Sequence, residues 1–341
     1  MPDPKFLVVR LSSLGDIVHT FPAVAALRET SPASEIVWLT HPRWELLVES
    51  SGLASEVWTI ETRSWSSLRK ILNRIREKKF SLAIDYQGLW KSAALPFFGS
   101  IPRRIGFSSQ TIREFGVPIL YTDRVRIAKT HIADQNGELS LCAGARKLAS
   151  AFTLHIESRE MEIVEQRLRG AAVDRYVVIS PGGGWTSKCW PPQRFGQLSQ
   201  KISQQLGLRC VLNCGPGEDR MISEIKAASG DSSPIEWKLP LEQLMALLRN
   251  ADCIVGGDTG PLHLAVALGT PAVALFGPTD PARNGPYWID DSPGVARCDI
   301  VLRSPRAVTS YKRGNEPDPS MLEIEVDAVF EAVRRLVEAR A

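Results

Sequence analysis

The sequence predicts an α/β protein made of two Rossmann-like, doubly wound domains that face each other across a cleft. The first observation is length, because 341 residues exceed what one hydrophobic core usually serves. The second is that short runs rich in Val, Leu and Ile alternate with segments of helical periodicity, as in parallel sheets covered by helices. The third is that this alternation runs twice, with a join between His155 and Asp174.

The elements of the first half follow one another as β-α-β-α. The strands are short apolar runs, as buried parallel strands are, and Pro22 stands early enough in the first helix to be tolerated. The expected order is a strand at 6–11, a turn at 12–15, a helix at 17–28, a strand at 35–39, a helix at 44–50, a strand at 56–60, a helix at 65–78 and a strand at 81–85.

The second half repeats the pattern. We expect strands at 176–180, 210–213, 253–256 and 272–276, and helices at 195–206, 218–228, 241–250 and 261–268. The stretch 323–340 has apolar residues at helical spacing. The predicted domains are therefore 1–165 and 166–320, followed by a C-terminal helix, 321–341, that packs back towards the N-terminal domain.

Composition limits the partners and the compartment. The 41 basic and 38 acidic side chains are too balanced to indicate a nucleic-acid partner. Six cysteines without a Cys-x-x-Cys pair indicate neither a zinc site nor a disulfide framework, and fit a reducing cytoplasm. Neither a signal peptide nor an apolar run of ~20 residues is visible. A basic cluster between Arg69 and Lys79 is either a solvated helix face or a contact with an anionic surface.

Two polar loops follow strands of the first half. In the loop Ser12-Ser13-Leu14-Gly15-Asp16, Asp16 is either a favourable charge at a helix start or a general base. Asp85 and the polar residues after it, Gln87 among them, suit acceptor binding and turn formation almost equally. His19 and His131 are lone histidines, for which a structural role is the simpler interpretation.

Three loops of the second half predict an anion site. Pro181 to Pro191 contains three glycines and then Thr186, Ser187 and Lys188, which suit phosphate oxygens, although a plain flexible loop is the alternative. In Gly256 to His263, the start of a helix supplies amides for a diphosphate, and Thr259 adds a hydroxyl. Asp258 would orient this loop or bind a sugar hydroxyl. The turn 276–281 ends the next strand at the same edge.

These loops together resemble glycosyltransferase family 9, the lipopolysaccharide heptosyltransferases, and within it the heptosyltransferase I group. The resembling motifs run in order through both halves: 12–20, 188–191, 258–260 with His263, and 276–281. The stretches 85–95, 110–114 and 127–129 carry the likeness to the heptosyltransferase I group. The resemblance implies a GT-B fold, with the donor held mostly by the C-terminal domain and the acceptor by the N-terminal domain.

The resemblance also implies an inverting, metal-independent transfer of heptose from ADP-heptose to a Kdo residue of the lipopolysaccharide inner core. It implies a cytoplasmic enzyme that works on Kdo-lipid A at the inner face of the membrane, needs no cofactor and leaves the oligomeric state open. Asp16 and Lys188 would be catalytic. The expected donor-binding residues are Ser12, Ser13, Gly15, Thr186, Ser187, Asp258, Thr259, Gly260, His263, Gly277, Pro278 and Thr279. The expected acceptor-binding residues are His19, Arg63, Gln87, Lys91, Arg113 and Lys129.

Other functions remain open on the residues alone. A family member could use another donor or acceptor. A nucleotide-sugar epimerase would keep the diphosphate loops without an acceptor site, and a non-catalytic sugar-nucleotide sensor would need no base. A dehydrogenase is remote, because no Gly-x-Gly-x-x-Gly follows the first strand.

Overall fold

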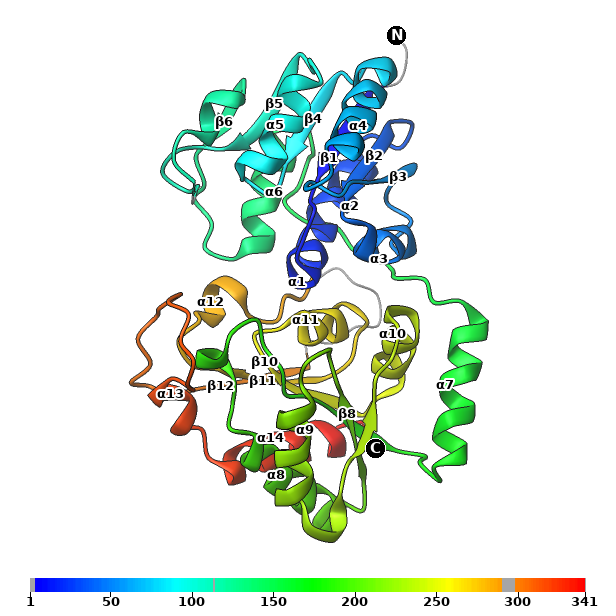
Figure 1. Ribbon diagram of the computed structural model, residues 1–341, viewed down its shortest axis with the longest axis vertical. Helices are drawn as coiled ribbons and strands as arrows, with labels where there is room; N and C mark the ends of the chain where they lie inside the picture. Colours follow the sequence, from blue (N-terminus) through cyan, green and yellow to red (C-terminus); the bar gives the residue numbers. More distant parts are fainter. Residues whose placement is uncertain (1–3, 113, 290–297, 341) are drawn as a thin grey trace. The chain divides into compact units, whose positions relative to one another are not determined.

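The computed structural model describes residues 4–112, 114–289 and 298–340. The chain divides into two compact units, the first formed by the residues up to His155 and the second by most residues from Ile156 on. Each unit contains one six-stranded sheet in which every paired strand is parallel. The predicted α/β class, with two Rossmann-like sheets, is confirmed (Figure 1).

The sheet of the first unit has the strand order β3-β2-β1-β4-β5-β6. Its strands are β1 (Lys5–Val9), β2 (Glu35–Thr40), β3 (Glu56–Thr59), β4 (Leu82–Asp85), β5 (Arg103–Phe107) and β6 (Asp123–Val125). The order of the strands reverses between β1 and β4. In open parallel sheets, ligands bind at the carboxyl ends of the strands where the order reverses, so the loops after β1 and β4 are the first place to look for a site.

Helices cover both faces of this sheet. They are α1 (Leu14–Val18), α2 (Phe21–Thr30), α3 (Glu45–Ser50), α4 (Trp65–Lys78), α5 (Trp90–Phe98) and α6 (Ile132–Cys142), with 3₁₀ turns η1 (Pro42–Trp44) and η2 (Val117–Leu120). On one face Ile71 and Ile75 of α4 and Leu95 of α5 pack against Leu7 and Val9 of β1. Helices α2 and α6 pack against each other, and the Ser140 hydroxyl donates to the Ala23 carbonyl at 2.8 Å.

The sheet of the second unit has the equivalent order, β12-β11-β10-β7-β8-β9, which reverses between β7 and β10. Its strands are β7 (Tyr176–Ser180), β8 (Arg209–Asn213), β9 (Ile235–Trp237), β10 (Cys253–Gly257), β11 (Ala272–Phe276) and β12 (Asp299–Arg303). Its helices are α7 (Ser158–Gly170), α8 (Pro192–Leu206), α9 (Asp219–Ala228), α10 (Leu241–Asn250), α11 (Gly260–Ala267), α12 (Pro281–Asn284), α13 (Pro319–Leu322) and α14 (Val326–Glu338), with 3₁₀ turns η3 (Thr186–Lys188) and η4 (Gly230–Ser232).

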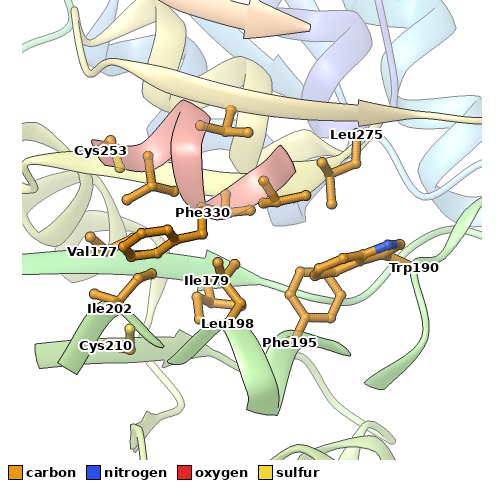
Figure 2. Close-up of a cluster of buried hydrophobic side chains, with 14 of the residues drawn as sticks. Val177, Ile179, Trp190, Phe195, Leu198, Ile202, Cys210, Cys253, Leu275 and Phe330 are labelled. Carbon is orange, nitrogen blue, oxygen red and sulfur yellow. The ribbon is translucent and has the colours of Figure 1, made fainter. Parts of the chain in front are cut away.

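The main core of the second unit lies between this sheet and α8, α9 and α14. Figure 2 shows Phe330 of α14 among Val177 of β7, Cys253 of β10 and Ile202 of α8. The apolar face of α14, the helix that is expected to pack back towards the N-terminal domain, is buried in this core. The apolar residues of α14 pack against β10, β11 and α8 of the same unit.

The single helix expected at 17–28 is two helices. Helix α1 ends at Val18 and α2 begins at Phe21, with Pro22 in its first turn. Proline lacks an amide hydrogen, so it fits a new helix start better than a helix interior. None of the helices within the described ranges is both long and apolar enough to cross a membrane.

Candidate functional site

The loop after β1 holds Asp16 by contacts to both carboxylate oxygens. Oδ2 accepts hydrogen bonds from the Ser13 amide at 3.0 Å and from the Ser13 hydroxyl at 2.8 Å. Oδ1 lies 2.6 Å from Nη2 of Arg10 in an ion pair. The interpretation of Asp16 as a residue that stabilises its own helix start is therefore correct in part. The side chain is nonetheless 43% exposed, so the carboxylate is fixed in place and still open to solvent.

Arg10 is the buried partner of this carboxylate. Its side chain is 5% exposed, and Nη1 donates to the Tyr86 carbonyl directly after β4. A buried guanidinium requires an anion or several acceptors. Arg10 therefore links the loops after β1 and β4, and its fixed positive charge forms an ion pair with Asp16.

Gln87 joins the same two loops. Its Oε1 accepts from the amides of Leu11 at 3.0 Å and Ser12 at 3.2 Å. Asp85, beside it, is buried and accepts from the amides of Gln87 and Gly88 and from the hydroxyls of Ser92 and Tyr121. Burial raises the pKa of Asp85 despite these four donors. Asp85 thus organises the turn, which was one of its two interpretations.

The expected acceptor-binding residues lie on several elements of the first unit. His19 is buried at the end of α1, where its ring meets that of His131 at 5.3 Å between centroids. Arg63 is exposed before α4, Lys91 in the first turn of α5, and Lys129 before α6. Arg113 lies outside the described residues. Within the described ranges, no hydrogen bond or ion pair links Arg63, Lys91 or Lys129 to Asp16.

Lys188, Asp258 and His263 form a buried cluster at the carboxyl edge of the second sheet. Nζ of Lys188 donates to the Asp258 carbonyl and lies 3.7 Å from the Asp258 carboxylate. Nε2 of His263 lies 3.1 Å from the other carboxylate oxygen. Burial alone would raise the pKa of Asp258, but the hydrogen bond from His263 and the charge of Lys188 outweigh it and hold that pKa below its usual range. The cluster therefore keeps Asp258 ionised and Lys188 at the start of α11.

Helix α11 begins at Gly260, two residues after Asp258. Thr259 is its N-cap and Pro261 stands in its first turn, so the amides of Gly260 and Leu262 have no partner within the helix. The Thr259 hydroxyl is buried and has no hydrogen-bond partner in the described part of the chain. A helix start with a cation beside it and an unsatisfied hydroxyl can bind an anionic oxygen.

The glycine-rich loop after β7 lies against the loop after β8. A methyl group on Gly182 would come within 1.8 Å of Oε1 of Glu218, whereas one on Gly184 would meet nothing within 4 Å. The other carboxylate oxygen of Glu218 accepts from the Gly215 amide at 2.7 Å. Glu218 is not among the site residues predicted from sequence, although an acidic residue after the second strand of a Rossmann unit is a known ribose ligand.

Ser187 and Thr186 have different environments. Thr186 is exposed at the start of η3. The Ser187 hydroxyl is buried, donates to the Lys312 carbonyl at 3.4 Å and accepts from the Gly314 amide at 3.4 Å. Two cations lie near the Trp185 ring: Nζ of Lys188 is 4.3 Å and the Arg313 guanidinium 5.5 Å from the ring centroid. The segment around Arg313 is thus part of the same candidate site, and none of its residues was predicted from sequence.

The turn after β11 is buried. A methyl group on Gly277 would come within 2.5 Å of Sδ of Met321, so close packing on α13 requires the glycine. The Pro278 carbonyl accepts from the Ser310 amide at 2.7 Å, and Thr279 is 1% exposed. Asp280 caps α12 through the Ala282 amide at 3.0 Å. These residues shape the edge beside α11.

Each unit therefore carries one candidate site at the point where the strand order of its sheet reverses. The first offers a fixed carboxylate, and the second offers a cation, a helix start and two glycine-rich loops for an anion. Within the described ranges, no group of three His, Cys, Asp or Glu side chains is arranged to hold a metal ion.

Comparison with known proteins identifies relatives of the whole chain. The sequence model of glycosyltransferase family 9 (heptosyltransferase) matches residues 68–292. Lipopolysaccharide heptosyltransferase 1 of Escherichia coli K12 is 27% identical over 318 residues, which cover 89% of this chain and 94% of that protein.

Two solved structures share the fold along nearly the full length. The family 9 glycosyl transferase of Veillonella parvula superposes with a TM-score of 0.83 at 22% identity, covering 98% of both chains. The E. coli heptosyltransferase WaaC, solved with ADP, superposes with a TM-score of 0.75 at 24% identity, covering 97% of this chain and 99% of that one.

Proposed function

The chain belongs to glycosyltransferase family 9, the heptosyltransferases of lipopolysaccharide core synthesis, and on that premise we propose that it transfers heptose from ADP-heptose to a Kdo residue of the inner core. The observation that carries the proposal is the buried Lys188–Asp258 contact at the start of α11. It puts a cation next to free helix amides, as a leaving diphosphate requires. The name of the WaaC structure, which was solved with ADP, supports this choice of donor.

In the proposed mechanism the second unit binds the donor. The diphosphate binds the amides of Gly260 and Leu262 and the Thr259 hydroxyl. An ammonium has three N–H donors, and Lys188 uses one on the Asp258 carbonyl, so it can also bind a phosphate oxygen. Glu218, in the loop after β8, accepts a hydrogen bond from a ribose hydroxyl of the donor in this mechanism.

The first unit supplies the base and binds the acceptor. Asp16 takes the proton of the Kdo hydroxyl as that oxygen attacks the anomeric carbon, and the carbon–oxygen bond to ADP breaks. Attack from the face opposite ADP inverts the configuration. Charge then grows on the diphosphate, where Lys188 and the helix start stabilise it. Because protein groups do this, the reaction needs no divalent metal.

The acceptor is anionic, and its lipid part belongs to a membrane. Exposed Arg63, Lys91 and Lys129 are the proposed cations for its carboxylates and phosphates. Work on such a substrate places the enzyme at the inner face of the cytoplasmic membrane. The exposed basic residues of α4, Arg69, Lys70 and Arg76 among them, favour an anionic surface.

The direct test is transfer by the purified protein, with ADP-heptose and Kdo₂-lipid A, in excess EDTA and in Mg²⁺. We expect equal turnover in both, a product heavier by one heptose, and the anomeric configuration opposite to that of the donor. Conversion of the donor without acceptor would instead show an epimerase. ADP-heptose binding without any turnover would show a sensor or a different acceptor.

A second measurement tests the donor site by itself. Lys188→Met should weaken ADP binding by roughly ten- to a hundred-fold in calorimetry, because it removes a charge-assisted contact. Lys201→Met is the matched control, since Lys201 is a partly exposed lysine of the same unit that pairs with Asp327. Equal ADP affinity in both variants would remove Lys188 from the donor site.

A further inference from the structure

Helix α5 exposes its apolar residues. Trp90, Phe97 and Phe98 are 46%, 40% and 56% exposed. Counted from Trp90, Phe97 and Phe98 stand at i+7 and i+8, so all three lie on one face of the helix. Ser92 and Leu95, on the opposite face, are buried. A helix on the surface of a globular protein normally shows polar residues to solvent, and this one shows aromatic rings.

The segment that leads into η2 extends the same surface. Phe115 is 99% exposed and Ile119 is 69% exposed. Val117 and Leu120 of the same segment are buried. A methyl group on Gly116 would lie 3.1 Å from the Trp90 ring, which places this segment directly against the start of α5. We call these five side chains the α5 patch: Trp90, Phe97, Phe98, Phe115 and Ile119.

Cations border the α5 patch. The Arg104 guanidinium lies 5.4 Å from the centroid of the Phe97 ring. Arg76 of α4 donates to the Phe98 carbonyl at 2.9 Å, and Arg69 stands two turns before it on the same face of α4. Lys91 is exposed beside Trp90. One acid is near, since Glu114 accepts from the Trp90 amide at 2.7 Å. The border is thus mainly positive.

We propose that the α5 patch inserts into the surface of an anionic lipid bilayer. Aromatic rings on a helix are favourable at the boundary between lipid headgroups and acyl chains. Arginines around such rings can pair with anionic headgroups. Charge complementarity selects this partner over a second copy of the chain, because a symmetric pair would bring the same cationic borders together. The inference rests on the proposed function, which requires the enzyme to reach a lipid-linked acceptor.

The test uses the full-length protein and sedimentation with vesicles of phosphatidylcholine alone or with a third of phosphatidylglycerol. The double variant Phe98→Ser with Phe115→Ser should bind the anionic vesicles at least about ten-fold more weakly than wild type. The matched control is Leu46→Ser with Leu322→Ser, which removes two leucines that are 50% and 45% exposed elsewhere on the chain. The control should bind as wild type does.

A second readout separates this inference from the proposed function. Transfer to a water-soluble, deacylated Kdo acceptor should be equal in wild type and in the patch variant, because Phe98 and Phe115 take no part in the chemistry. Equal vesicle binding by the patch variant and wild type would overturn the inference, whatever the enzyme transfers. A concentration-dependent dimer that the patch variant loses, without any response to vesicles, would overturn it in favour of a second copy of the chain. Failure of wild type to transfer heptose, with vesicle binding intact and lost in the patch variant, would overturn the proposed function alone.

Discussion

Nη2 of Arg10 lies 2.6 Å from Oδ1 of Asp16, and the arginine is buried while the aspartate reaches solvent. The two side chains are held by different contacts within the first unit. Arg10 is fixed from inside by the Tyr86 carbonyl, and Asp16 is fixed from its own helix by Ser13. A carboxylate held from two sides needs no rearrangement before it accepts a proton, so these contacts support the proposed role of Asp16 as the base.

We therefore predict that Arg10 is a positioning residue. Arg10→Met should lower kcat by roughly ten- to a hundred-fold, because Asp16 loses one of its two anchors. The affinity for ADP should stay unchanged, since Arg10 belongs to the first unit and the donor loops to the second. Arg10→Lys should restore part of kcat, and steady-state kinetics with ADP calorimetry measure both. A kcat within two-fold of wild type in the methionine variant would show that the pair is only structural.

The glycine loop after β7 offers a matched pair of substitutions. Gly182→Ala places a methyl group 1.8 Å from Oε1 of Glu218, so the carboxylate has to move. Gly184→Ala meets nothing within 4 Å in the same loop. We predict that Gly182→Ala weakens ADP binding by about ten-fold, the worth of one good hydrogen bond to a charged group. Gly184→Ala should bind ADP as wild type does. The reverse order of the two affinities would exclude Glu218 from the donor site.

Trp190 anchors the loop of Lys188 in the core of the second unit. It is 1% exposed and meets Phe195 edge-on at 4.9 Å between ring centroids. Figure 2 shows these two side chains next to each other. Nε1 of Trp190 donates to the Ile324 carbonyl at 2.9 Å. Trp190→Ala should lower the free energy of unfolding by about 3–5 kcal/mol. Trp65→Ala should change it by less than about 0.5 kcal/mol, because Trp65 is 86% exposed. Urea unfolding measures both, and equal losses in the two variants would contradict the packing described.

Glu56 gives a prediction on pH. The hydrogen bond from Lys78, with those of neighbouring groups, lowers the pKa of Glu56 from 4.5 to about 2. A carboxyl group whose pKa is lower in the folded state stabilises the protein above its unfolded pKa, and loses that effect as pH falls towards its folded pKa. The difference in unfolding free energy between wild type and Glu56→Gln should thus be constant above pH ~5 and shrink down to pH ~2. Because Glu56 is 36% exposed, solvent screening keeps the difference small. A difference that grows as the pH falls would contradict the assignment.

The strands that lie in the middle of each sheet were predictable from sequence. Strands β7 and β11 are continuous apolar runs, because helices cover both faces, and their bounds agree with the prediction. Strand β5 begins with Arg103 and Arg104, and β6 has three residues, so neither has such a run. Helix α6 buries Asn136, which donates to the His19 carbonyl at 3.0 Å. A buried amide with a distant partner breaks the apolar pattern by which a helix is recognised.

The positions of the candidate site loops were predictable where they depend on strand ends. The loops that contain Asp16, Lys188 and Asp258 follow central strands, and ligand-binding loops of parallel sheets are found there. Arg10 was not predictable, because it stands at the end of an apolar run and its partner Tyr86 is 76 residues away in the chain. Glu218 was missed for a similar reason, since only the fold brings it against Gly182.

The most direct test of Asp16 as the base is the turnover of Asp16→Asn with saturating ADP-heptose and Kdo₂-lipid A, measured beside the ADP affinity of the same protein. Asparagine keeps the size of the side chain and cannot take the proton, and Glu49→Gln, an exposed acid of the same unit, is the control. We predict that kcat falls by about two to four orders of magnitude in Asp16→Asn, while its ADP affinity and the kcat of the control stay unchanged. A kcat within ten-fold of wild type would contradict it, because the transfer would then not use Asp16 as its base.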